Sequence, residues 1–282
     1  MMRTTLLAML VVAMAAASST AQTVRKSVGA NAAAIQAAVD QFRADLGVLQ
    51  TGPSTGVGPN ARREINWDAV PDAFATPNSF PGNFFNQVSG SPVGRVRGAL
   101  FTTSSGTMEV SSNAASGVTT LFGNRNADND DDFAAFSAER IFGLKDTVTV
   151  DMTFSVPGSP SVPATVRGFG VIFTDVELAD AAKIELFDVN NALLFSGAAD
   201  PFAFTGGDSF KSFSFIGASY ADPIVSRVRI TNGGFDVDLD QLGVNDATAM
   251  DDFIYGEPVA VPETGAVLLA LIGGAGFWIR RR

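Results

Sequence analysis

The sequence contains no cysteine and no histidine among its 282 residues. Without cysteine there is no disulfide framework, so an exported fold must be held together by burial of its core. Without either residue type, cysteine/histidine zinc sites, histidine-based triads and cysteine nucleophiles are excluded. Catalysis would have to use carboxylates, and 29 Asp and Glu residues make a suitably spaced pair too common to be informative. We therefore expect a protein that is not an enzyme, with a secreted carboxylate-dependent hydrolase as the weakest alternative.

Basic residues are also few. The chain has 19 Lys and Arg against 29 Asp and Glu, a formal net charge of −10. Without the two terminal segments described below, the body keeps 15 basic and all 29 acidic residues, a net charge of −14. A nucleic-acid partner requires a basic face, so this class of partner is disfavoured. Divalent cations or simple solubility fit the acidic balance better.

Residues 1–21 have the pattern of a secretory signal peptide. Arg3 supplies the positive start, residues 6–17 are a continuous apolar stretch, and small residues follow at Ser19 and Ala21. This pattern predicts export by the general machinery and cleavage before Gln22. The alternative, an uncleaved anchor helix, requires a longer apolar run.

The other end of the chain has three parts in a fixed order. A short polar motif precedes an apolar run at residues 266–279, and a basic cluster ends the chain. As a helix this run would be about 21 Å long, which predicts a short transmembrane helix with its arginines in the cytoplasm and the body outside. The motif and the basic cluster consist of Val261, Pro262, Glu263, Thr264, Gly265, Arg280, Arg281 and Arg282.

This tripartite end resembles the PEP-CTERM sorting signal of Gram-negative bacteria, which an exosortase recognises and removes. Thr264 stands where that family usually has a second proline. The motif also resembles the sortase signal Leu-Pro-x-Thr-Gly, with Val261 in place of leucine. Both resemblances imply a processing enzyme and attachment at the cell envelope, the outer surface or the extracellular matrix, after transient anchoring in the inner membrane. The short, glycine-rich apolar run favours the exosortase interpretation.

Residues 30–46 are the best helix candidate. Ile35, Val39, Phe42 and Leu46 recur at spacings of four, three and four, which places them on one helical face. Such a helix either packs against the body or forms an extension at the mature N-terminus. A stretch rich in Gly, Pro, Ser and Thr follows it and is typical of a linker.

The rest of the chain has the two-residue period of β-strands. Alternation is clear at residues 148–156, and residues 184–187 and 192–195 flank a hairpin turn at Asn190 and Asn191. We predict a mainly β fold, an antiparallel β-sandwich of jelly-roll type, with a short N-terminal helix and a C-terminal transmembrane helix. The expected segments are a signal peptide (1–21), helix plus flexible linker (22–62), β-sandwich (63–258) and sorting segment (261–282).

The closing strand carries two adjacent acidic residues, Asp251 and Asp252. Residues 249–253 resemble the last strand of many extracellular jelly-roll modules, carbohydrate-binding ones included, in which an Asp pair precedes an aromatic or aliphatic residue. One member of any adjacent pair should point inward, and a buried carboxylate needs a cation, an arginine or backbone amides as its partner. The pair is therefore a candidate calcium site.

Asp128, Asp130 and Asp132 form a second candidate calcium site. Alternate oxygen-bearing side chains match the hard ligands that Ca²⁺ prefers. Phe133 occupies the position where an EF-hand loop needs glycine, so this loop type does not fit. The alternative is a solvated acidic loop.

A second alternating set lies at Asp236, Asp238 and Asp240. An exposed strand explains these three residues if Phe235, Val237 and Leu239 face the other way.

Trp67 is the one candidate platform for stacking against a sugar ring, and the alternative is a core position. The leading hypothesis is an exported, non-enzymatic envelope or matrix protein, stabilised by calcium, whose partners are the export machinery and an exosortase-type enzyme. The alternative is a carbohydrate-binding module for extracellular polysaccharide.

Overall fold

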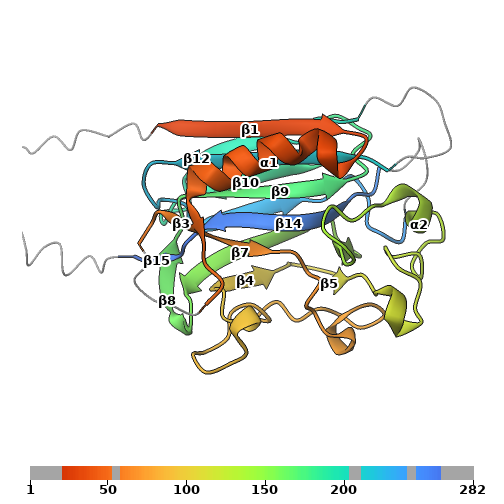
Figure 1. Cartoon of the computed structure of the whole chain (residues 1–282), viewed down its shortest axis with the longest axis horizontal. Helices are drawn as coiled ribbons and strands as arrows, with labels where there is room; N and C mark the ends of the chain where they lie inside the picture. Colours follow the sequence, from red (N-terminus) through yellow and green to blue (C-terminus); the bar gives the residue numbers. More distant parts are fainter. Residues whose placement is uncertain (1–20, 53–57, 203–210, 240–245, 262–282) are drawn as a thin grey trace, which may run out of the picture.

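The computed structural model describes residues 21–52, 58–202, 211–239 and 246–261, and in these ranges the protein is mainly β (Figure 1). One sheet contains β1 (Gln22–Gly29), β2 (Val48–Leu49), β3 (Ala61–Ile65), β5 (Thr107–Val110), β6 (Phe142–Lys145), β9 (Gly168–Thr174), β12 (Phe213–Tyr220) and β14 (Ala249–Gly256). The other contains β4 (Ala99–Thr102), β7 (Thr149–Val156), β8 (Ser159–Thr165), β10 (Lys183–Phe187), β11 (Leu193–Ala198), β13 (Arg227–Thr231) and β15 (Val259–Ala260). Helices are α1 (Ala32–Leu46) and α2 (Asn129–Asp132), with 3-10 turns η1 (Asp72–Phe74), η2 (Val93–Arg95) and η3 (Ala114–Ser116).

The strand order mixes the two ends of the chain. The first sheet runs β1-β12-β9-β14-β3-β2, with β6 beside β14 and β5 beside β6. The second runs β11-β10-β13-β7-β8-β15, with β4 beside β7. Among the described strands, all pairs are antiparallel except the short pair β2 and β3. The predicted antiparallel two-sheet arrangement is therefore present.

Helix α1 confirms the predicted helix and lies across the outer face of the first sheet (Figure 1). The Asn31 side chain caps its start by accepting a hydrogen bond from the Ala34 N–H at 3.1 Å. The four predicted apolar residues are all fully buried against Ile172, Phe213, Phe215 and Ile254 of the sheet. The helix therefore packs on the body, and the sheet beneath it is covered on both faces.

Two glycines make room for the helix. Gly170 of β9 and Gly217 of β12 stand opposite each other in the sheet. A Cβ atom would come within 2.6 Å of the Phe42 ring at Gly170 and within 2.8 Å at Gly217. The missing side chains therefore form the recess that the Phe42 ring fills.

The two sheets differ in how much of each strand they bury. All residues of β9, β12 and β14 are buried, because the core between the sheets covers one face and α1 covers part of the other. Strand β13 instead alternates between buried and outward-facing residues. The strands predicted from alternation at 148–156 and from the hairpin at 184–195 are confirmed as β7, β10 and β11, and Asn191 has the expected positive φ of 61°.

The N-terminal region contributes more than a helix and a linker. Strand β1 pairs with β12 along its whole length, and β3 begins at Ala61. Residues 53–57 of the expected linker lie outside the described residues.

The predicted fold class is wrong in its terminal helix. None of the helices in the described ranges is long and apolar enough to cross a membrane. The segment on which that prediction falls, residues 266–279, lies outside the described residues, as do the predicted signal residues 1–20. The described residues therefore form a mainly β sandwich of two sheets with one long covering helix.

Candidate functional site

Asp251 and Asp252 occupy an irregularity in β14. Met250 faces Phe173 and Phe253 faces Val171, so the two acidic residues stand where the neighbouring strand β9 supplies one residue. This arrangement is a β-bulge, which re-aims side chains within a strand. Both residues are buried, with exposed fractions of 0% and 2%, as are all other residues of β14.

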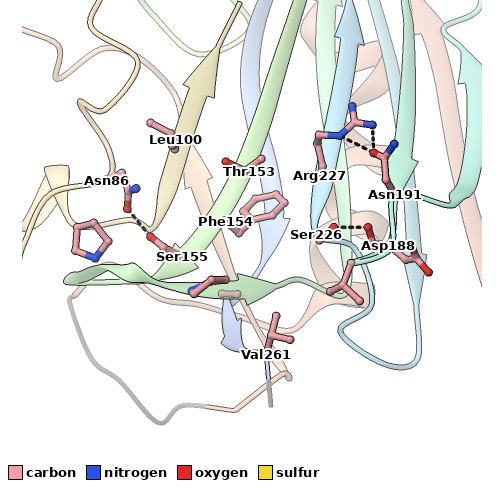
Figure 2. A pocket seen from close by; sticks show the side chains of 14 residues that line it. Asn86, Leu100, Thr153, Phe154, Ser155, Asp188, Asn191, Ser226, Arg227 and Val261 are labelled. Carbon is pink, nitrogen blue, oxygen red and sulfur yellow. Dashed lines mark hydrogen bonds between the residues drawn. The ribbon is translucent and has the colours of Figure 1, made fainter. Parts of the chain in front are cut away.

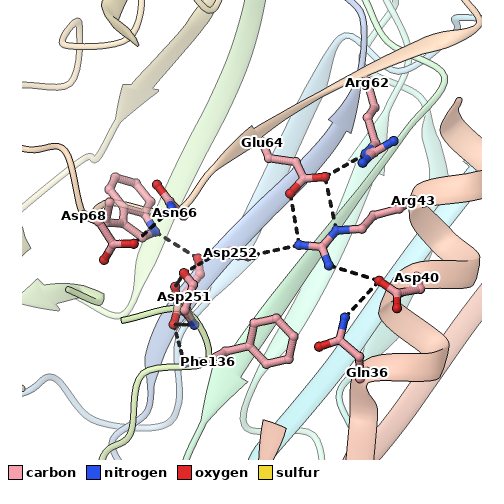
Figure 3. Close-up of polar contacts among 12 residues, drawn as sticks. Gln36, Asp40, Arg43, Arg62, Glu64, Asn66, Asp68, Phe136, Asp251 and Asp252 are labelled. Atoms are coloured by element: carbon pink, nitrogen blue, oxygen red, sulfur yellow. Dashed lines mark hydrogen bonds and ion pairs between the residues drawn. The ribbon is translucent and has the colours of Figure 1, made fainter. Parts of the chain in front are cut away.

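The two carboxyl groups share the hydroxyl of Ser137 (Figure 3). Its Oγ lies 3.2 Å from Asp251 Oδ1 and 2.8 Å from Asp252 Oδ1. Asp251 Oδ2 also accepts hydrogen bonds from the backbone N–H groups of Phe136 and, at 3.0 Å, Ser137. A hydroxyl has one hydrogen to donate, so both of its contacts are hydrogen bonds if one carboxyl is protonated and donates in turn.

The pKa shifts of both residues favour a protonated, neutral carboxyl group in the pair. Burial, followed by the charge of Asp252, raises the pKa of Asp251 well above its usual range, and the two amide hydrogen bonds only partly oppose this. Burial also raises the pKa of Asp252, against the lowering effects of the Ser137 hydroxyl and the Arg43 charge. Because Arg43 pairs with Asp252, the neutral form is favoured more strongly at Asp251.

Arg43 connects this pair to the helix. Its Nη2 donates to Asp252 Oδ2 and to Glu64 Oε2, both at 3.0 Å, and its Nε donates to Glu64 Oε1 at 3.1 Å (Figure 3). Arg62 Nε donates to the same carboxylate of Glu64 at 2.7 Å. One guanidinium group therefore joins α1, β3 and β14 in a single half-buried network.

This arrangement is a closed polar cross-link. Hydroxyl, amide and guanidinium groups already occupy the carboxylate oxygens of Asp251 and Asp252. In the ranges that the structure describes, no group of three or more acidic side chains is placed to hold a metal ion. Calcium binding at this pair stays an untested prediction.

Sequence reasoning missed Arg43, Glu64 and Ser137. The Arg43–Asp252 contact joins residues 209 positions apart, and no local pattern reports such a contact. The available signal was general: a buried acidic residue needs an arginine or backbone amides, and the structure supplies both.

Asp128, Asp130 and Asp132 lie at the start of α2 and along it. Residues two apart on a helix are roughly 200° apart around its axis, so Asp130 points away from Asp128 and Asp132, which lie four apart on the same side. Asp130 Oδ1 accepts a hydrogen bond from the Thr120 hydroxyl at 3.0 Å, and Asp132 is buried. Calcium binding at these residues is likewise untested.

The predicted acidic strand at residues 236–240 is wrong over its described part. Residues 236–239 form a turn, and Asp240 lies outside the described residues. Asp236 closes the turn by accepting from the backbone N–H of Asp146 at 2.7 Å and of Asp238 at 3.0 Å. Backbone amides, rather than a strand face, position this carboxylate.

Trp67 lies in the core, so its proposed role as a sugar-stacking platform is wrong. Its exposed fraction is 1%, its ring stacks on Phe142 at 4.4 Å, and its Nε1 donates to the Asp251 carbonyl at 2.9 Å. No indole face remains for a surface ligand.

An open groove of about 700 Å³ lies on the second sheet beside β8 (Figure 2). Its walls combine apolar residues with polar side chains that bond to one another. Ser155 pairs with Asn86, and Arg227 pairs with Asn191. Groups that already satisfy one another offer little hydrogen bonding to an incoming ligand.

The sorting motif begins on the wall of this groove. Val261 lines it, and the Val261 N–H donates to the Pro163 carbonyl at 3.0 Å, immediately after β15 pairs with β8. The remaining motif residues lie outside the described residues: Pro262, Glu263, Thr264, Gly265, Arg280, Arg281 and Arg282.

No family model matches the chain, and no curated protein matches it.

Proposed function

We propose that this chain is an exported, non-enzymatic protein of the cell envelope or extracellular matrix, sorted through its C-terminal segment. The observation that carries the proposal is the position of the two expected processing points relative to the sheets. Strand β1 begins at Gln22, the first residue after the expected cleavage, and β15 ends at Ala260, one residue before the motif.

Removal of residues 1–21 would leave the first sheet complete. All eight residues of β1 pair with β12, and the Gln22 side chain donates to the Tyr220 hydroxyl at 2.9 Å. At the other end, β15 holds the chain to the edge of the second sheet up to Val261. Processing within the motif would therefore leave both sheets intact.

The acidic side chains support a structural rather than a catalytic role. The most perturbed carboxyl group, Asp251, is fully buried and tied to backbone amides. A general acid or base must reach a substrate, directly or through a water molecule. Trp67 is buried, so it cannot be the sugar-binding surface of the polysaccharide-binding alternative. A different pocket is the candidate site for that alternative.

The test follows both ends of the full chain in a Gram-negative host and in the same host without its exosortase. We expect intact mass to give an N-terminus at Gln22 in both, and loss of the C-terminal segment only where the exosortase is present. Changing Glu263 to Ala together with Pro262 to Ala should leave the tail attached and the protein in the inner membrane.

Asp222→Ala, at an exposed position in the body, is the matched control and should be processed like the unchanged chain. An N-terminus at Met1, or normal processing of the motif variant, would contradict the sorting proposal. Hydrolysis of a polysaccharide that is lost on changing two carboxylates would contradict the non-enzymatic part.

A further inference from the structure

A second, more enclosed pocket opens between the end of β3 and the turn η2. Its volume is about 370 Å³, within the range of about 300–1,000 Å³ that is typical of small-molecule sites. Its lining includes the aromatic side chains of Trp67, Phe84 and Phe85, which are 1%, 3% and 6% exposed, and the more exposed Pro71 and Pro92, with Arg95 and Arg97 at its margin. A largely apolar lining beside two positive charges suits a ligand with both an apolar face and an anionic group.

Arg95 is held in place by aromatic rings and lacks a polar partner for one of its N–H groups. Its guanidinium carbon lies 4.2 Å from the centre of the Phe84 ring and 5.5 Å from that of Phe74. Its Nε is buried, and no acceptor among the described residues bonds to it. A buried donor without a partner is unfavourable, so a shift of the Arg95 side chain that gives this Nε an acceptor on a ligand would be favoured.

Arg97 adds a second charge that no carboxylate neutralises. Its Nε donates to the Gly94 carbonyl at 3.0 Å and its Nη1 to the Glu64 carbonyl at 2.6 Å. Within the described ranges, neither Arg95 nor Arg97 forms an ion pair. In a body of net charge −14, two uncompensated arginines at one pocket are complementary to an anion.

We propose that this pocket binds a carboxylated sugar ring, as in a uronic-acid residue of an acidic polysaccharide. The carboxylate pairs with the guanidinium of Arg95, whose planar fork matches carboxylate geometry. The apolar face of the ring lies against the exposed Pro71 and Pro92 of the lining, and its hydroxyls face the polar margin at Asn66. A bare mineral anion would use only the charges. The site is independent of the sorting proposal, because it needs neither end of the chain.

Calorimetric titration of the full chain with D-glucuronate, D-glucose and benzoate tests this inference. Glucose lacks the carboxylate and benzoate lacks the hydroxyls, so each removes one part of the proposed recognition. We expect glucuronate to bind at least about tenfold more tightly than glucose, since the difference is a charge-assisted interaction. It should also bind more tightly than benzoate, and quenching or a shift of Trp67 fluorescence should accompany binding.

Arg95→Gln should weaken glucuronate binding at least about tenfold. Arg95→Lys, which keeps the charge but loses the fork, should show an intermediate loss. Arg229→Gln removes an arginine that is 46% exposed on the other sheet and should leave binding unchanged. Circular dichroism melts establish that each variant is folded.

Three outcomes would overturn the inference. The first is an absence of glucuronate binding to the folded chain. The second is equal binding of glucuronate and glucose, or equal binding by the chain and a folded Arg95→Gln variant. The third is tighter binding of benzoate, which would assign the pocket to aromatic acids in place of sugars.

Discussion

Aspartate side chains on the two sheets have pKa values shifted in opposite directions. On the open face of the second sheet, Asp151 accepts from Arg229 at 2.8 and 2.9 Å and from Arg227 at 3.2 Å. Burial tends to raise the pKa of Asp151, but these two arginines outweigh it and hold the pKa below its ordinary value. On the first sheet, burial dominates and raises the pKa of Asp251 and Asp252.

The cover over each sheet explains the difference. The segment at Phe136 and Ser137 lies over Asp251, and α1 reaches Asp252 through Arg43, so the β14 bulge is buried and the charged form of a carboxyl group is disfavoured there. No helix in the described ranges covers Asp151, which is 23% exposed and pairs with Arg227 and Arg229 on the sheet surface. The cover over the first sheet therefore explains why the Asp251–Asp252 pair is part of the core and Asp151 is a partly exposed ion.

The largest effect should come from uncovering the first sheet. Phe42→Ala removes the ring that fills the recess at Gly170 and Gly217, and we expect the free energy of unfolding to fall by about 3–5 kcal/mol. Phe187→Ala, on the open face of the second sheet, removes a half-buried ring stacked under Arg227 and should cost about 1 kcal/mol. Urea unfolding curves measure both, and equal losses would contradict the difference between the sheets.

The next effect compares two arginines. Arg43→Met leaves Asp252 and Glu64 without their shared cation, and we expect a loss of about 2–3 kcal/mol, below the value for a fully buried pair because Arg43 is 19% exposed. Arg229→Met removes an exposed ion pair on the second sheet and should cost less than about 1 kcal/mol.

The same urea curves measure the two arginine variants. A cost for Arg43→Met as small as that for Arg229→Met would mean that the cross-link between α1, β3 and β14 contributes little to stability. The double variant with Asp252→Asn tests the pair itself. Its cost should be less than the sum of the two single costs, because the residues are in contact.

Periodicity predicted the elements behind this comparison, but long-range contacts decided the chemistry. The spacing from Ile35 to Leu46 predicted α1, because a helix buries residues three and four apart. The sequence also located Asp251 and Asp252 on the closing strand. It did not predict the bulge, the burial of both residues or the Arg43 and Ser137 contacts, because these depend on the packing of distant segments. The alternation at residues 236–239 was misleading, because backbone amides capture Asp236 in a turn.

The pH dependence of stability should also differ between the carboxyl groups of the two sheets. The pKa of Asp251 is higher in the folded than in the unfolded chain, so the folded state binds more protons between those two values. Asp251 therefore contributes more stability as the pH falls from 7 towards the unfolded value of about 4. The pKa of Asp151 is lowered, so its contribution is present above about pH 4 and is lost as the pH falls through its folded pKa.

Urea midpoints at pH 5, 6 and 7 test these signs. Asp251→Asn keeps an oxygen for the backbone amides and removes the titration, so its midpoint should change less with pH than that of the unchanged chain. Other buried carboxyl groups, Asp246 and Glu257, also have raised pKa values, so the difference between variant and unchanged chain is the informative quantity. Asp151→Asn should leave the profile between pH 5 and 7 unchanged. A flatter profile for Asp151→Asn than for Asp251→Asn would reverse the assignment.

The smallest effect should come from calcium. The carboxylates of Asp251 and Asp252 are occupied by protein donors, and Asp130 lies on the opposite side of α2 from Asp128 and Asp132, so the three carboxylates do not converge. A ligand stabilises a fold only through a site that the folded state offers, so we expect millimolar calcium and EDTA to give melting midpoints within about 2 °C of each other. A rise of several degrees with calcium, lost in Asp130→Asn, would show that the α2 segment rearranges around an ion. The same rise, lost instead in Asp252→Asn, would mean that a cation can replace Arg43 as the partner of the buried pair. Either result would weaken the comparison of the two sheets. A bound metal ion, rather than burial or a nearby arginine, would then determine the charge of those carboxyl groups.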